Sequence, residues 1–333
     1  MIFLGGLVGL FLGGVAATAV GLSFGVMTPL TGPLTPLLAP LVGLPGPVVI
    51  ALVSLAVIIL YVFTYALATV ALLPSIATAT GPGAPATTAP PPRPPALPAN
   101  PLEGFMRGIL IGMTAVLNFF VLALLGVSVP FVPGPLGVLV GLVVFLAVFP
   151  PVSASAFYQG VLGWLSWLMP MSHLATAVGL LLFLLNLPFA IAAALAAGAP
   201  SPIRFDVLTA TLETTGGALI GLTGFAGGFN LGNFTFVTPG PPPGSRTPFN
   251  GAGPGGAIIG GLSSHETGHT LNVAVFSGVV TWINAIDENV LPLRRNSLAY
   301  GELAAESHLS RGGFGLAPGA AVVFVPRQHI ALW

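Results

Sequence analysis

Charge is what this sequence lacks most. The chain of 333 residues has 8 acidic and 8 basic side chains, so charged residues make up 5% and the formal net charge is zero. In soluble proteins, about 25% of the residues are charged. No charged residue occurs from Met1 to Pro92 or from Gly108 to Ile203, and such runs are typical of segments that cross a lipid bilayer. The sequence predicts an integral membrane protein, and its zero net charge argues against a nucleic-acid partner.

Cysteine and lysine are absent altogether. Without cysteine, the chain has no disulfides and no thiolate metal ligands. All 8 basic residues are arginine, and glycine (45) and proline (34) are abundant. This usage is typical of a GC-rich genome, from which we expect a bacterial protein of the inner (cytoplasmic) membrane.

Four apolar runs are long enough to cross a bilayer. They are Met1 to Met27, Val48 to Leu73, Gly108 to Val129 and Leu174 to Gly198. The shorter runs 136–149 and 152–169 leave one or two further spans open. We expect a mainly α integral membrane protein, a multi-span helical bundle with a small Gly-rich β element and a C-terminal helical HExxH domain.

Proline and glycine divide the chain into five segments. The expected order is two N-terminal spans (1–73), a Pro-rich linker (74–103), membrane helices (104–200), a Gly/Pro-rich β element and loop (201–256) and a metal-site domain (257–333). The linker is expected to be extended or disordered, because proline lacks a backbone donor. Glu103 and Arg107, four residues apart, predict an exposed ion pair at the start of the next helix.

The chemistry of the chain is concentrated near its end. Residues 265–269 read His-Glu-Thr-Gly-His, the HExxH pattern, in a chain that has only 5 histidines. On a helix this pattern places two imidazoles one turn apart with a carboxylate beside them, as a zinc-activated water requires.

We expect Ala257 to Ile283 to form one helix, because a single helical face recurs along it. That face comprises Ile258, Leu262, His265, His269, Asn272, Phe276, Val279 and Ile283. Unpaired polar groups on such an apolar stripe cost about 1–3 kcal/mol each. A divalent cation would satisfy both imidazoles.

A third ligand is needed, because catalytic zinc usually takes three protein ligands and a water. Glu302 and His308 are the candidates. We favour Glu302, since Glu306 lies four residues on and shares its helical face, where it can orient a ligand. Asn272 is a second candidate for such a supporting position, and His308 remains the alternative ligand.

The two helices together resemble the gluzincin metallopeptidases, and more narrowly bacterial membrane metallopeptidase-type proteins of little-known function that carry HExGH followed by ExxA[DE]. The matching residues are His265, Glu266, Gly268, His269, Glu302, Ala305 and Glu306, within about 42 of 333 residues. The resemblance implies that His265, His269 and Glu302 bind Zn2+ and that Glu266 is the general base. Glu306 stands where the usual pattern has Asp.

From this resemblance we expect a membrane-embedded zinc metallopeptidase that acts on membrane or exported proteins. Glu266 would take a proton from the activated water and return it to the leaving amine. Tyr300, Asn272 and His308 are the candidates for stabilising the oxyanion.

Two other interpretations stay open. Glu266 or Glu302 could pair with Arg294 or Arg295 in a satisfied polar cluster. Separately, the chain could be a non-catalytic membrane subunit or scaffold of a larger complex, with a structural or degenerate metal site. An ion-coupled transporter fits poorly, because its spans normally carry ionisable groups and the long uncharged runs here contain only His173.

Overall fold

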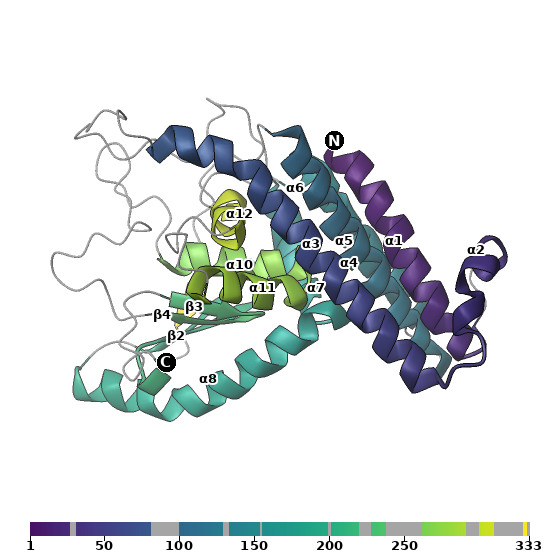
Figure 1. The fold of residues 1–333 in the computed structure, drawn as a ribbon. Coiled ribbons are helices and arrows are strands. Elements are labelled where there is room, and N and C mark those ends of the chain that lie inside the picture. The colour runs from purple at the N-terminus through teal and green to yellow at the C-terminus, as the bar shows by residue number, and fades with distance from the viewer. Residues whose placement is uncertain are drawn as a thin grey trace. The chain divides into compact units, whose positions relative to one another are not determined.

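The computed structural model describes residues 1–26, 31–80, 100–128, 133–153, 155–198, 201–219, 228–237, 262–290, 300–309 and 329–331. Most of them are helical (Figure 1). The chain divides into two compact units, residues 1–71 with 100–149 and residues 72–99 with 150–333.

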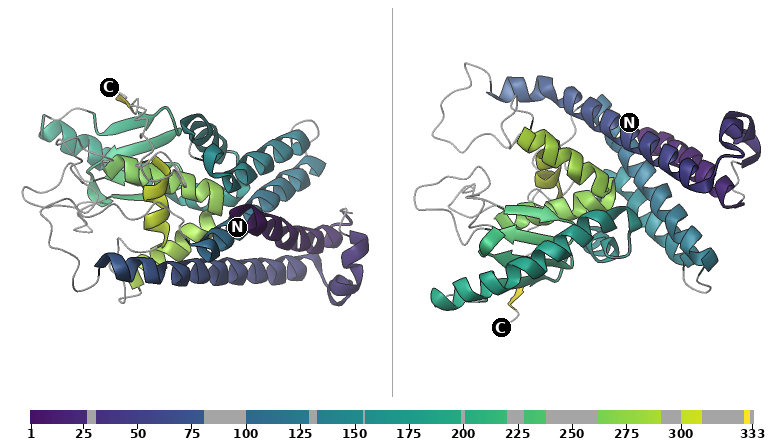
Figure 2. Two further views of the ribbon diagram at one scale, coloured as in Figure 1. Left: turned by 90° about the horizontal axis from the view of Figure 1, so that it is seen from above. Right: turned by 60° about the horizontal axis from the view of Figure 1, so that its bottom comes forward.

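The first unit is built from helices. They are α1 (Ile2–Ser23), α2 (Thr31–Leu38), most of α3 (Gly46–Thr80), α4 (Pro101–Ser128) and α5 (Pro133–Phe145), with short 3-10 turns η1 (Ala39–Leu41) and η2 (Leu146–Val148). Helix α4 packs against both α1 and α5 (Figures 1 and 2).

Glycines set the separation of α1 and α4. A Cβ atom placed on Gly5 or Gly9 of α1, or on Gly108 or Gly112 of α4, would collide with the backbone of the other helix. Small residues at four-residue spacing allow such close backbone contact between apolar helices. The glycine content of the first apolar run therefore serves helix packing.

Four described helices are long and apolar enough to cross a membrane. They comprise α1, residues Gly46–Leu72 of α3, Pro101–Leu125 of α4, and α8 (Pro170–Ala196). These are the four runs predicted from the sequence. The two shorter runs form α5 with η2, and α6 (Pro150–Ser153) with α7 (Ala156–Ser166), and neither run gives a described helix of spanning length.

Two expectations for the region around the linker were wrong. Helix α3 continues to Thr80, because the prolines of this region, apart from Pro74, lie beyond residue 80; residues 81–99 lie outside the described part. Glu103 and Arg107 do pair, with Arg107 Nη2 2.6 Å from Glu103 Oε1. The pair is buried, however, at 0% and 1% exposure, because tertiary packing covers this turn of α4.

The second unit combines helices with a mixed sheet. Its helices are α6, α7, α8, α10 (Leu262–Phe276), α11 (Gly278–Val290) and α12 (Tyr300–Leu309). The strands are β1 (Ile203–Asp206), β2 (Thr211–Thr215), β3 (Gly228–Leu231), β4 (Phe234–Val237) and β5 (His329–Ala331), in the order β3-β4-β2-β1-β5. Only the β2–β4 pairing is parallel. The predicted β element is confirmed, whereas β5 was not anticipated.

The sheet lies between two helical layers, with α8 on one face and α10 on the other (Figure 1). Strand alternation explains this arrangement. Phe234 and Phe236 of β4 point to the α8 side and form a core with Phe183. Thr235, between them in sequence, points to the α10 side, where it accepts a hydrogen bond from Asn230 of β3.

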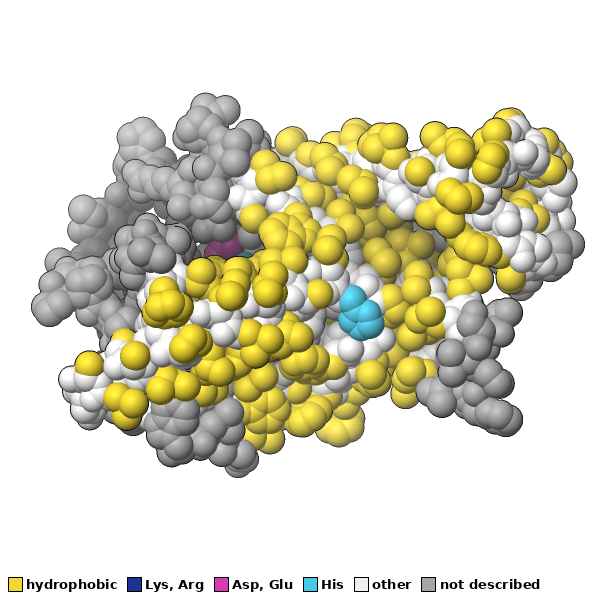
Figure 3. All heavy atoms as spheres, turned by 90° about the horizontal axis from the view of Figure 1, so that it is seen from below, with side chains coloured by type: hydrophobic (Ala, Val, Ile, Leu, Met, Phe, Trp, Pro, Cys, Tyr) yellow, Lys and Arg dark blue, Asp and Glu magenta, His cyan; other side chains and the backbone are white. Residues whose placement is uncertain are grey.

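The other face of α8 is exposed and apolar. Figure 3 views the side on which α8 lies in Figure 1, and hydrophobic side chains dominate it. The exposed large residues of α8 are Leu174, Leu180, Leu181, Leu184, Leu185, Phe189 and Leu195. Helix α8 thus has one face that packs on the sheet and one that is suited to lipid.

Candidate metal centre

Helix α10 is held on the sheet by a polar contact next to the HExxH histidine. Thr270 donates a hydrogen bond to the carbonyl of Gly232 (2.8 Å) and accepts one from Asn230 Nδ2 (2.9 Å). Thr211 of β2 also donates to it (3.3 Å). Because Thr270 is fully buried, these bonds fix the rotation of α10, and with it the direction of the neighbouring His269.

His269 meets the second helix of the motif. Its Nε2 lies 3.2 Å from Oε1 of Glu302 in α12. The two residues are 33 positions apart in sequence, and both are mostly buried, with side-chain exposures of 14% and 7%. The contact joins the HExxH helix to the ExxxE helix through one expected ligand from each.

A glycine permits this approach. A Cβ on Gly268 would come within 2.8 Å of the carbonyl carbon and 3.0 Å of the Cα of Ala305, and closer still to its oxygen. Helices α10 and α12 therefore touch backbone to backbone one residue from His269. The glycine and alanine of the HExGH and ExxA patterns have a packing role here.

Glu266 lies on the same helix, against strand β3. Its carboxylate packs so closely on Gly228 that a Cβ there would lie 2.7 Å from Glu266 Oε1. Glu266 is 3% exposed and lines a cavity.

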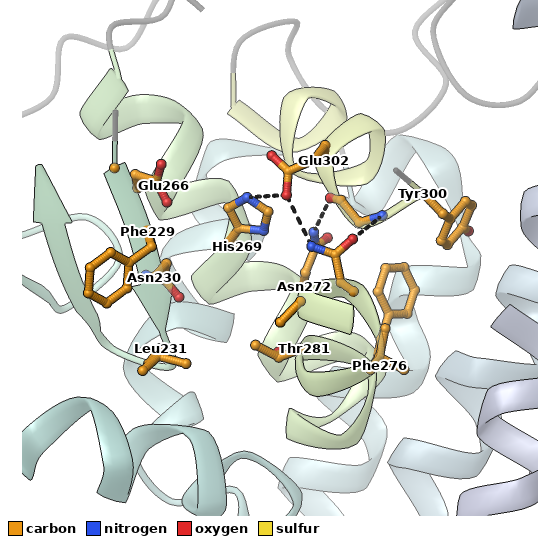
Figure 4. A pocket seen from close by; sticks show the side chains of 15 residues that line it. Phe229, Asn230, Leu231, Glu266, His269, Asn272, Phe276, Thr281, Tyr300 and Glu302 are labelled. Carbon is orange, nitrogen blue, oxygen red and sulfur yellow. Dashed lines mark hydrogen bonds and ion pairs between the residues drawn. The ribbon is translucent and has the colours of Figure 1, made fainter. Parts of the chain in front are cut away.

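One cavity of about 280 Å3 brings these groups together (Figure 4). Five of the predicted site residues line it: Glu266, His269, Asn272, Tyr300 and Glu302. Strand β3 forms one wall, and Phe276, Val280 and Ala285 contribute an apolar one. In Figure 4, Tyr300 lies on the other side of Asn272 from Glu266, so the two candidate catalytic side chains line different parts of the cavity.

For the remaining predicted ligand and supporting residues, the structure describes the position in a helix but not the side chain. His265 lies one turn before His269 in α10, and Glu306 and His308 lie in α12. Their side chains, and Arg294 and Arg295 entirely, lie outside the described residues. Among the side chains that are described, no group of three or more His, Cys, Asp or Glu comes together. The expected set of three includes His265, so zinc ligation stays a prediction.

The described pair fits such an ion chemically. An imidazole nitrogen and a carboxylate oxygen are ligands that zinc takes in proteins, and here they lie 3.2 Å apart on a cavity wall. In addition, Asn272 donates to the carbonyl of Gly301 (3.0 Å), the residue before Glu302. The predicted supporting residue therefore holds the backbone next to Glu302.

The expected single helix 257–283 is wrong at Ser277. This residue has φ of 80° and ends α10, and its Oγ then accepts a hydrogen bond from Val279 N (3.2 Å) at the start of α11. The apolar stripe continues through this position, so periodicity could not reveal the break. The change of direction brings α11 against α12.

Sequence reasoning missed Asn284, which the break in the helix brings into the site. Its Nδ2 donates to Glu302 Oε1 (3.0 Å), and its Oδ1 accepts from Gly301 N (3.0 Å). The signal was available, because Val280, Asn284 and Asp287 recur at i, i+4 and i+7 and thus share one face of α11. All three are buried.

Comparisons with protein-family models, with curated proteins and with solved structures find no match for this chain.

Proposed function

We propose that this chain is an integral membrane protein with a zinc metallopeptidase-like site in its C-terminal region. Four helices of spanning length and composition support the membrane assignment. So do the exposed apolar side chains of α3, such as Leu55, Ile59 and Phe63, and those of α8. Water would solvate such surfaces poorly, whereas lipid would cover them at little cost.

One observation carries the metallopeptidase part of the proposal. His269 of the HExxH helix and Glu302 of the ExxxE helix are 3.2 Å apart on the wall of a cavity that Glu266 also lines. A chance five-residue pattern gives no reason for a distant glutamate of the expected type to meet its second histidine. The pairing therefore supports the two-helix interpretation.

The proposed roles follow from these positions. His265, His269 and Glu302 would hold the ion, which when bound would supply Lewis-acid activation of water. The Glu266 carboxylate would accept a proton from water and return it to the leaving amine. Asn272 and Tyr300 line the same cavity and are the described candidates for contacting the substrate carbonyl.

Strand β3 favours a polypeptide substrate. It is the terminal strand of the sheet and, among the described strands, pairs with β4 alone. Residues 228–231 also line the cavity. An extended peptide can add to such an edge through main-chain hydrogen bonds. Because the chain is proposed to lie in a membrane, membrane or exported proteins are the substrates we expect.

A specific observation also supports the non-catalytic alternative. His269 and Glu302 contact one another directly, and Asn284 donates to the same carboxylate. This cluster can satisfy its polar groups without an ion. A membrane subunit that uses the cluster only to join α10, α11 and α12 is therefore the second candidate.

Washing and chelation test the proposal. We expect membranes to retain the chain through an alkaline carbonate wash, and the detergent-purified chain to cleave some members of a mixture of extended unstructured peptides. Treatment with 1,10-phenanthroline should abolish cleavage, and added zinc should restore it. Release by carbonate would refute the membrane assignment. Absence of cleavage would favour the subunit interpretation, and cleavage that chelation leaves unchanged would refute zinc-dependent hydrolysis.

A further inference from the structure

Both polar atoms of the Asn284 side-chain amide form hydrogen bonds with the start of α12, one with its backbone and one with a side chain. Its Oδ1 accepts from Gly301 N and its Nδ2 donates to Glu302 Oε1, both at 3.0 Å. The residue is 8% exposed and lies on the cavity wall. It comes from α11, a helix outside the HExxH and ExxxE pattern.

The orientation of this amide is determined by its partners. A backbone N–H can only donate, so the Asn284 atom that faces Gly301 must be the oxygen. The amino group must therefore face Glu302, where it needs an acceptor. This arrangement selects a carboxylate oxygen as its partner and holds that oxygen in one position.

The same oxygen is the one that faces His269. Glu302 Oε1 lies 3.2 Å from His269 Nε2 and 3.0 Å from Asn284 Nδ2. The segment that carries it is also fixed from α10, because Asn272 donates to the carbonyl of Gly301. The peptide unit before Glu302 is thus held from one helix and its side chain from another.

We infer that Asn284 is a positioning residue that orients the Glu302 carboxylate toward the HExxH helix for metal binding. The inference rests on the proposed function, since it assigns a partner to one of the proposed ligands. Hydrogen bonds to a ligating carboxylate fix its orientation, and their loss typically weakens metal binding by about 10–100-fold.

The test compares two isosteric substitutions in the full-length, detergent-purified chain. Asn284→Asp keeps the acceptor for Gly301 N but places a carboxylate oxygen against Glu302. Asn186→Asp makes the same change in a buried asparagine of α8 (0% exposed) that does not line the cavity. Its Oδ1 likewise accepts from a backbone N–H, that of Leu219, and its Nδ2 donates to Thr214 Oγ1 and to the carbonyl of Gly216. Zinc affinity is measured by competition with a chromophoric chelator, and folding by thermal unfolding.

We expect Asn284→Asp to weaken zinc binding by about tenfold or more, with Asn186→Asp within about twofold of the wild type. If Asn284→Asp does not fold, Asn284→Ala removes both the donor to Glu302 and the acceptor for Gly301 N without adding charge, and a loss of about fivefold or more is expected once the hydrogen bond to Glu302 is missing. Wild-type affinity in the folded Asn284 variant, or equal losses in the two Asp variants, would overturn the inference and leave the zinc site standing. A wild-type chain that binds no zinc would overturn the proposed function and this inference with it.

Discussion

Replacement of Glu266 by Gln is expected to reduce peptide hydrolysis by about 10²- to 10⁴-fold, the usual contribution of a general base. The substitution preserves the shape of the side chain and removes its ability to accept a proton. Because Glu266 packs on the backbone of Gly228, a side chain of the same size should keep the wall of the cavity intact. Zinc content should stay at the wild-type level, since Glu266 is not among the proposed ligands.

Glu213→Gln is the matched control for this experiment. Glu213 is also a buried glutamate of the second unit (3% exposed), and it lies in β2 with Arg204 as its cross-strand partner at 3.9 Å. We expect the Glu213→Gln variant to hydrolyse peptide at a rate within about twofold of the wild type, since this glutamate is assigned no catalytic role. The measurement compares the initial rates of both variants and the wild type on the same peptide, with zinc content measured in parallel. An undiminished rate in Glu266→Gln would rule out this residue as the base.

Gly268→Ala is expected to destabilise the second unit, although helix propensity alone predicts the opposite. An alanine in a helix interior is favoured over glycine by about 1 kcal/mol. Here, however, the added Cβ would collide with the backbone of Ala305, and backbone atoms cannot rotate away as a side chain can. Overpacking of this kind costs about 1–3 kcal/mol. The separation of α10 from α12 should also weaken zinc binding, because it moves His269 away from Glu302.

Thermal unfolding and zinc affinity measure this effect. A net loss of about 1–2 kcal/mol corresponds to an unfolding temperature lower by about 2–8 °C. Gly32→Ala is the control, since Gly32 is helical and exposed and a Cβ there would meet nothing within 4 Å. That variant should be neutral or slightly more stable. If the Gly268→Ala variant had the unfolding temperature and the zinc affinity of the wild type, this result would contradict the close packing of α10 on α12.

Apolar periodicity and charge depletion predicted the parts of the fold that depend on local pattern. The four long helices and the cavity-lining stripe of His269, Asn272 and Phe276 follow from residue spacing. The break at Ser277 does not, because the apolar spacing continues across it while one residue adopts a left-handed conformation. The spacing of Val280, Asn284 and Asp287 marks a buried face of α11, but the spacing does not indicate that this face meets Glu302.

Long-range contacts account for the other differences. Strand β5 has three residues and pairs with β1, more than 120 positions earlier, so no local signal marks it as a strand. The Glu103–Arg107 pair was predicted from its spacing, but its burial depends on which elements cover that turn. The meeting of His269 with Glu302 was expected from a resemblance to known two-helix sites. The motif indicated which residues to compare, and the tertiary structure supplies the contact between them.

The zinc content of the detergent-purified chain tests the central claim most directly. Elemental analysis would compare the wild type with His269→Ala and Glu302→Ala after equal exposure to zinc and removal of excess metal. The account predicts about one zinc per chain in the wild type and a large loss in both variants, because each variant removes one of three proposed ligands. A wild-type chain without zinc, or variants that keep it in full, would contradict the account and leave the His269–Glu302 contact as a structural link between helices.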